Sequence, residues 1–182
     1  MRGENALNIV PECYVDTNLT ETLTGFICNH QKGCPAVAKQ MKEKMQDRFA
    51  LGIIDKDKRR VSYADEFELL AKNDSLEILK HPQKPHYIIY IKPAVERFIF
   101  KAVEELNLKL SDFKLPDDFE DFKRESKNQD TKKDSHFKQL FKALSNASDM
   151  QLLRKLIVYL QANPYSAIKE VIKDFFIPSL NK

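Results

Sequence analysis

Two pairs of acidic residues stand where strands of a sheet are expected to end. Glu12 and Asp16 come at and just after the end of the apolar segment at residues 7–15, and Asp55 and Asp57 follow the apolar segment at residues 49–54. Because neighbouring parallel strands end at the same sheet edge, we expect three or four carboxylates to converge there. Such a cluster repels itself unless a cation neutralises it, and oxygen ligands suit Mg²⁺ or Mn²⁺ rather than zinc.

The second acidic pair also has a simpler interpretation. Asp55-Lys56-Asp57 begins a run of charges, as in many solvated loops between a strand and a helix. Alone, this pattern favours a charged loop. The acids at the end of another strand favour a shared site.

The order of these motifs resembles the Toprim domain. That family has a strand, then Glu-Gly-x-x-Asp and a helix, and later a strand ending in Asp-x-Asp. This chain has Glu12-Cys13-Tyr14-Val15-Asp16 and, later, Leu51-Gly52-Ile53-Ile54-Asp55-Lys56-Asp57. The similarity covers about residues 7 to 106, and a Gly33-Cys34-Pro35 turn between the motifs also resembles the family. Among Toprim proteins, small defence-associated and OLD-type nucleases are the most similar.

The resemblance implies a nuclease-like activity, the Mg²⁺-dependent hydrolysis of phosphodiester bonds in nucleic acid. Glu12 would be the general acid or base, Asp55 and Asp57 would hold the Mg²⁺ or Mn²⁺, and Asp16 would support them or add a ligand. The basic residues beside the second motif would contact phosphates: Lys56, Lys58, Arg59 and Arg60.

Glu96 is a further acid expected at the same edge, just after the apolar segment at residues 86–91. It could complete a second metal site, and Pro93-x-x-Glu96 is similar to a segment of small Toprim-related proteins linked to phage defence. A glutamate in the first turn of a helix is equally expected from the helix dipole. Both interpretations stay open.

One departure from the family pattern favours a different class of function. Cys13 stands where the family usually has glycine, and that glycine commonly lets backbone approach the substrate. The alternative is therefore a catalytically weak or inactive Toprim-like module that regulates or binds a partner, for instance in phage defence. A structural zinc site on Cys28, His30 and Cys34 is a weaker alternative, because no fourth ligand lies nearby.

Apolar segments alternate with helical patterns through about residue 106. This alternation predicts an α/β fold with a mostly parallel, Toprim-like sheet flanked by helices. We expect strands near residues 7–15, 26–28, 49–54 and 86–91, and helices near residues 63–72 and 93–106. The predicted organisation is a Toprim-like domain at residues 1–110, a polar linker or loop at 111–135, and a helical C-terminal extension at 136–182 with a break at Asn163-Pro164.

Composition sets the remaining expectations. The 182 residues carry 30 Lys and Arg against 27 Asp and Glu, a net charge of +3 that is too small to indicate nucleic-acid binding by itself. With no apolar run of signal-peptide or membrane-span length, we expect a cytoplasmic protein without membrane contact. Nucleic acid is the expected partner, and the C-terminal helices could form a homodimer or bind a protein.

Overall fold

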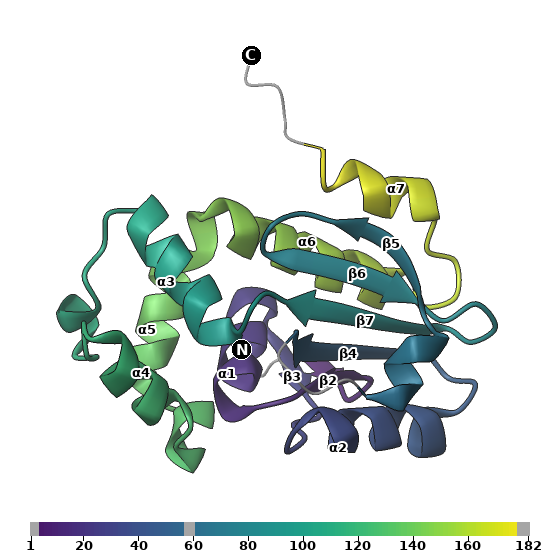
Figure 1. The fold of residues 1–182 in the computed structure, drawn as a ribbon, viewed down its shortest axis with the longest axis horizontal. Helices are drawn as coiled ribbons and strands as arrows, with labels where there is room; N and C mark the ends of the chain where they lie inside the picture. Colours follow the sequence, from purple (N-terminus) through teal and green to yellow (C-terminus); the bar gives the residue numbers. More distant parts are fainter. Residues whose placement is uncertain (1–3, 57–60, 178–182) are drawn as a thin grey trace.

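The computed structural model describes residues 4–56 and 61–177 and has an α/β fold (Figure 1). The strands are β1 (Glu4–Ala6), β2 (Ile9–Pro11), β3 (Phe26–Cys28), β4 (Ala50–Asp55), β5 (Glu68–Lys72), β6 (Leu76–Lys80) and β7 (His86–Ile91). The α-helices are α1 (Tyr14–Thr24), α2 (Cys34–Lys39), α3 (Val95–Glu105), α4 (Phe119–Ser126), α5 (Ser135–Ala143), α6 (Ser148–Ala162) and α7 (Lys169–Asp174). A π-helical segment (Gln40–Met45) extends α2, and short 3₁₀ turns lie at Ser62–Glu66, Leu110–Phe113, Gln129–Lys132 and Leu144–Asn146.

The central sheet is mixed. Its order is β2-β4-β7-β6-β5, with β2, β4 and β7 parallel to one another and β6 and β5 in antiparallel pairing. The expected α/β fold is confirmed, but only the β2-β4-β7 half of the sheet is parallel. That half is the one that ends in the acidic residues.

The first strands extend the parallel half. β1 pairs with β3 in parallel, and two backbone hydrogen bonds continue this pairing, from Asn29 N to Ile9 O (2.9 Å) and from Gln31 N to Pro11 O (3.0 Å). The chain after β3 therefore runs beside β2 as far as its carboxyl end. This path brings residues 29–33 to the edge where Glu12 lies.

Both faces of the parallel strands are buried, which explains why they read as continuous apolar runs. Leu51 and Ile53 of β4 pack in a core that extends to α1, α3, α5 and α6. Ala50 and Ile54, which alternate with them, pack on the opposite face in a smaller cluster with α2, its π-helical extension and Tyr63. Gly52 lies on this second face, where an added Cβ would approach Met41 Sδ to 2.9 Å, so α2 and its extension lie very close to the sheet.

The chain between β4 and β7 differs from the predicted pattern. Residues 63–72, expected as a helix, form a 3₁₀ turn followed by strand β5, and β6 was not predicted. Asn73 accounts for the hairpin, because its Oδ1 accepts hydrogen bonds from Ser75 N (2.9 Å) and Leu76 N (2.7 Å) and so turns the chain. β5 lies at the sheet edge with Leu69 about half exposed.

The polar segment at residues 111–135 also differs from the expected linker or loop. It contains α4 and 3₁₀ turns, and Phe122, Ser126 and Thr131 are buried. Asp118 begins α4 by accepting hydrogen bonds from the N–H groups of Glu120 and Asp121. Charged residues cover the outside of this segment, while its few apolar side chains pack inward.

The predicted C-terminal helices are confirmed as α5, α6 and α7, with α6 ending at Ala162 before the Asn163-Pro164 break. Their apolar faces share one core with the sheet, which runs from Ile9 of β2 to Phe141 of α5 and Ile172 of α7. The helical C-terminal part is thus continuous with the α/β core. Among the described residues, no helix is long and apolar enough to cross a membrane.

Candidate acidic site

The carboxyl ends of the parallel strands bring three acids to one edge of the sheet. Glu12 follows β2, Asp55 is the last residue of β4, and Glu96 lies in the first turn of α3, a few residues after β7. Parallel pairing aligns Pro11 with Ile53 and Asp55 with Ile91. The convergence expected for Glu12, Asp55 and Glu96 therefore follows from strand direction and register.

Hydrogen bonds hold two of these carboxylates in place. Glu12 Oε2 accepts from the backbone N–H of Asp55 at 3.0 Å, while the N–H of Glu12 donates to Ile53 O at 3.0 Å. Asp55 Oδ1 accepts from the N–H of Val95 at 2.9 Å, which ties β4 to the start of α3. The backbone of one acidic segment thus positions the side chain of the next.

Asp16 is the fourth acid, and it lies in the first turn of α1 with only 1% of its surface exposed. Its Oδ2 accepts a hydrogen bond from the thiol of Cys13 at 2.8 Å, but its buried Oδ1 has no partner. The pKa of Asp16 rises to about 8, mainly through burial and also through the charges of Glu12 and Glu96, against the lowering effect of the hydrogen bonds from Cys13. An unpaired buried carboxylate oxygen is unusual and requires a physical explanation.

The pKa of Asp55 is raised even more than that of Asp16. Burial is the main cause, and the charges of Asp16, Glu12 and Glu96 add to it, so the pKa of Asp55 rises to about 10 despite the hydrogen bond from Val95 N. The four acids therefore act on one another electrostatically. Within the described residues, none of them forms an ion pair with a lysine or arginine.

Glu96 belongs to this group rather than to an exposed helix end. Its surface is 7% exposed, and its Oε1 accepts a hydrogen bond from Ser126 Oγ of α4 at 2.7 Å. The glutamate does stand in the first turn of α3, where the dipole favours it. Its burial among other acids is a cost that the dipole alone does not explain.

A cavity of about 460 Å³ opens at these acids. Glu12, Asp55 and Glu96 form part of its wall. The rest of the wall is Cys13, Tyr14, Val15, His30, Lys32, Gly33, Ser126 and Lys127. The volume is in the range of small-molecule sites, about 300 to 1,000 Å³.

The basic residues expected to contact phosphate are only partly described. Lys56 Nζ forms an ion pair with Glu77 Oε2 at 2.5 Å and also lies 5.8 Å from the ring centre of Tyr90. Lys56 is therefore held beside β6 and β7 and is not part of the cavity wall. The other expected residues, Asp57, Lys58, Arg59 and Arg60, lie outside the described part of the chain.

Two other lysines line the cavity. Lys32 follows β3, and Lys127 follows the last turn of α4. Neither lysine was among the site residues predicted from the sequence, and His30 was predicted only as a possible zinc ligand. The signal that was available for Lys32 and His30 is their place after a strand beside β2, at the same edge as the acids.

Cys13, the departure from the Toprim pattern, fits its position without backbone strain. Its φ of −132° and ψ of 175° are extended values that any residue adopts. It caps α1, because Sγ accepts from Asp16 N at 3.4 Å while the thiol donates to the same residue's carboxylate. The position therefore does not require glycine for its own conformation.

Zinc binding by the three soft ligands is not supported by their positions. Cys28 packs in the large core, whereas Cys34 packs in the cluster on the opposite face of the sheet. In residues 4–56 and 61–177, no three His, Cys, Asp or Glu side chains are grouped so as to hold a metal ion as they stand. The donors of the acidic edge, all carboxylate oxygens with one buried oxygen unpaired, fit a hard cation such as Mg²⁺ or Mn²⁺ in type.

Comparison with known proteins adds no assignment, since no family model, curated protein or solved structure matches the chain.

Proposed function

We propose that the acidic edge binds Mg²⁺ or Mn²⁺ and that the protein is a Toprim-like phosphoryl-transfer enzyme that hydrolyses phosphodiester bonds in nucleic acid. One observation carries the proposal. Four carboxylates lie close enough to act on one another, three of them line one cavity, and burial with mutual repulsion raises the pKa of Asp16 and Asp55. No lysine or arginine among the described residues neutralises them. A cation would remove this repulsion.

Asp55 and Asp16 are the described residues that would hold the ion; Asp57, the further ligand expected from the sequence, lies outside the described residues. When bound, the ion supplies Lewis-acid stabilisation of the charge that develops on a phosphoryl oxygen. Glu12 is suited to move a proton. Its Oε2 is fixed by the Asp55 N–H, and within the described residues Oε1 has no hydrogen-bond partner, so it can accept a proton from a water molecule.

Lys32 and Lys127, which line the same cavity, would attract the phosphate. This role replaces the one expected of Lys56, whose ammonium group is paired with Glu77. Ser126 would keep Glu96 oriented through their hydrogen bond. Thus the polar segment at residues 111–135 contributes to the site through α4.

Calorimetric titration with MnCl₂ tests the metal site. We expect wild type to bind Mn²⁺ and Asp55→Asn to lose at least tenfold in affinity, because a carboxylate ligand is replaced by a neutral amide. Glu104→Gln is the matched control, since Glu104 is an exposed acid on α3. Equal affinity of wild type and Asp55→Asn would contradict the proposal.

Incubation with labelled DNA and RNA, single-stranded and duplex, in Mn²⁺ tests the reaction. Wild type should cleave at least one substrate, and Glu12→Gln should lose cleavage by 10² or more while still binding Mn²⁺. A contaminating nuclease would cleave equally in both preparations. That result would refute the assigned role of Glu12.

A binding module without hydrolysis is the second candidate, and one contact favours it. The Cys13 thiol hydrogen bonds to Asp16 Oδ2, so one oxygen of the fourth acid is already occupied. In this case the protein would bind Mn²⁺ and nucleic acid without cleaving any of the four substrates. Cleavage that depends on Glu12 would exclude it.

A further inference from the structure

Two aromatic rings and two lysines line the cavity together with the acids. Tyr14, the first residue of α1, stacks on His30 with ring centres 4.5 Å apart and planes inclined by 23°. Lys32 Nζ lies 6.0 Å from the centre of the Tyr14 ring. Both rings and Lys32 line the same cavity as Glu12 and Asp55. Ring, ammonium and acidic groups are thus within reach of one ligand.

His30 serves as a fixed, neutral support for Tyr14. Thr17 Oγ1 donates its proton to Cys13 O at 2.8 Å, so it must accept from His30 Nδ1 at 3.0 Å. The ring proton of neutral His30 is therefore on Nδ1. Burial lowers the pKa of His30, with the charges of Lys132 and Lys32 adding to the effect. One face of the Tyr14 ring is consequently covered by an uncharged ring held by α1.

The lysines give the cavity an anion-binding side. Lys32 and Lys127 are exposed, and neither forms an ion pair within the part of the chain that the structure describes. The structural lysines elsewhere differ, because Lys56 and Lys92 both pair with Glu77, and Lys101 pairs with Asp149. The charges of Lys32 and Lys127 are thus available to a phosphate.

The aromatic ring and the small cavity favour single-stranded over double-stranded nucleic acid. An aromatic ring at the wall stacks on the face of a base, and base faces in a duplex are already covered by neighbouring base pairs. The cavity of about 460 Å³ has the size of a small-molecule site. It suits one splayed-out nucleotide rather than a section of double helix.

We infer that the ligand is an unpaired nucleotide unit of single-stranded nucleic acid, with its base on Tyr14 and its phosphate between the acidic edge and Lys32 and Lys127. The inference rests on the proposed function and adds the substrate form to it. Base stacking does not read sequence strongly, since every base has a π-face. We therefore expect little preference among homopolymer sequences.

Fluorescence anisotropy with a labelled 12-nucleotide single strand and a 12-base-pair duplex tests this, with Ca²⁺ present as the cation. Wild type should bind the single strand at least tenfold more tightly than the duplex. Tyr14→Ala should weaken single-strand binding about 5- to 100-fold, the usual effect of removing one stacking ring. Tyr14→Phe should bind like wild type because it keeps the ring.

Tyr165→Ala is the matched control, since Tyr165 is 70% exposed and belongs to no part of the cavity. Circular-dichroism melting of each variant checks folding. Lys32→Ala should reduce the slope of log affinity against log salt by about 0.7, as expected for one lost phosphate contact to a single strand. An unchanged slope would remove Lys32 from the assigned role.

The outcomes separate the two proposals. Equal affinity for duplex and single strand, or unchanged binding by folded Tyr14→Ala, overturns the inference while leaving Mn²⁺ binding and Glu12-dependent cleavage intact. Absence of Mn²⁺ binding by wild type overturns the proposed function instead. Loss of single-strand binding in Tyr14→Ala, with wild-type Mn²⁺ affinity, supports the inference.

Discussion

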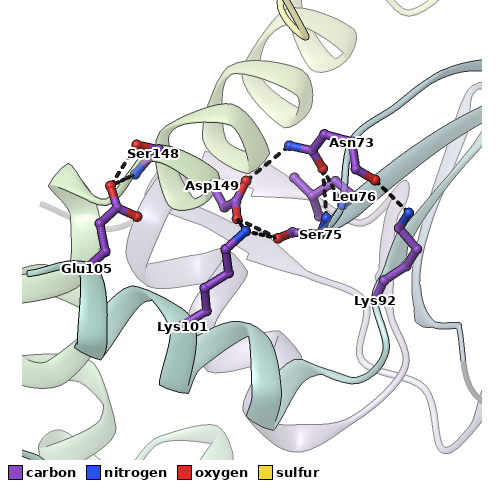
Figure 2. A network of polar contacts seen from close by, with 8 residues as sticks. All are labelled: Asn73, Ser75, Leu76, Lys92, Lys101, Glu105, Ser148 and Asp149. Carbon is purple, nitrogen blue, oxygen red and sulfur yellow. Dashed lines mark hydrogen bonds and ion pairs between the residues drawn. The ribbon is translucent and has the colours of Figure 1, made fainter. Parts of the chain in front are cut away.

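Asp149 and the acids of the acidic edge are held in different surroundings. Asp149, in the first turn of α6, receives hydrogen bonds from Asn73 Nδ2 (3.1 Å), Ser75 Oγ (2.5 Å) and Lys101 Nζ (2.7 Å). Figure 2 shows these groups from the β5–β6 turn and α3 pointing toward its carboxylate. At the acidic edge, Asp55 has one donor, the Val95 N–H.

The pKa values move in opposite directions as a result. Burial acts to raise the pKa of Asp149, but hydrogen bonds and the charge of Lys101 outweigh it and hold the pKa below its usual value. Burial and, secondarily, the charges of three neighbouring acids together raise the pKa of Asp55 to about 10. Asp149 is surrounded by donors, whereas the acids of the proposed site form no ion pair with a lysine or arginine among the described residues.

The largest expected effect is on the unfolding free energy when Asp149 is replaced. Asp149→Ala would leave Lys101, Ser75 and Asn73 without their shared acceptor and detach α6 from the β5–β6 turn. We expect a loss of about 2–4 kcal/mol in unfolding free energy, measured by urea denaturation. Asp130→Ala, at an exposed acid, should change it by less than about 0.5 kcal/mol. Equal unfolding free energies of Asp149→Ala and Asp130→Ala would mean that the hydrogen bonds to Asp149 do not stabilise the fold.

The next effect is the pH dependence of stability in EDTA. Asp55 has a folded pKa above its unfolded value, so its contribution is present at low pH and is lost as pH rises toward about 10. Asp149 has a lowered pKa, and its contribution is lost only as pH falls below the ordinary aspartate range. Between pH 7 and 9, wild type should lose on the order of 2 kcal/mol more unfolding free energy than Asp55→Asn.

Parallel urea curves at pH 7, 8 and 9 measure this difference. The Asn side chain keeps an oxygen for the Val95 N–H, so the variant should fold. Mn²⁺ should restore wild-type stability at pH 9 and leave Asp55→Asn unchanged, because binding to the folded state alone stabilises it. Identical pH profiles for the two proteins would show that Asp55 is ionised at neutral pH.

The sequence predicted β4, β7 and the acids that follow them, but of the strand expected at residues 7–15 only Ile9–Pro11 form β2, and α1 begins at Tyr14. β4 and β7 are apolar runs buried on both faces, and an acid at the end of such a run must lie at the strands' carboxyl edge. The convergence of Glu12, Asp55 and Glu96 therefore required only strand order and direction. The Leu69-Leu70-Ala71 segment was mistaken for helix because a short apolar run fits either structure, and its edge position in the sheet is a tertiary property.

The other parts of the site depend on contacts between distant residues. Ser126 reaches Glu96 across 30 positions, and no local pattern marks either residue as the other's partner. Tyr14 and His30 meet because the chain after β3 returns beside β2. The polar segment that carries Ser126 and Lys127 appeared solvated because only single apolar residues, such as Phe122, point inward.

A smaller effect is expected where α4 meets the acidic edge. Ser126→Ala removes the donor to Glu96 and leaves a buried carboxylate oxygen without that partner. Unfolding free energy should fall by about 1–2 kcal/mol at pH 7 without metal. Ser145→Ala is the control, because that hydroxyl bonds only to the backbone near an exposed helix end. A fall no larger than the control's would indicate that Glu96 does not need Ser126.

The smallest expected effect is at Cys13. Its sulfur accepts from Asp16 N and its thiol donates to Asp16 Oδ2, so a hydroxyl can take both roles while alanine can take neither. Cys13→Ala should destabilise the protein by about 0.5–1 kcal/mol, as for a lost helix cap, and Cys13→Ser should lie within about 0.5 kcal/mol of wild type. Thermal melts in EDTA measure both. If Cys13→Ala also tightens Mn²⁺ binding, the thiol competes with the cation for Asp16. The donor to Asp16 would then weaken cation binding, whereas the donors to Asp149 stabilise the fold.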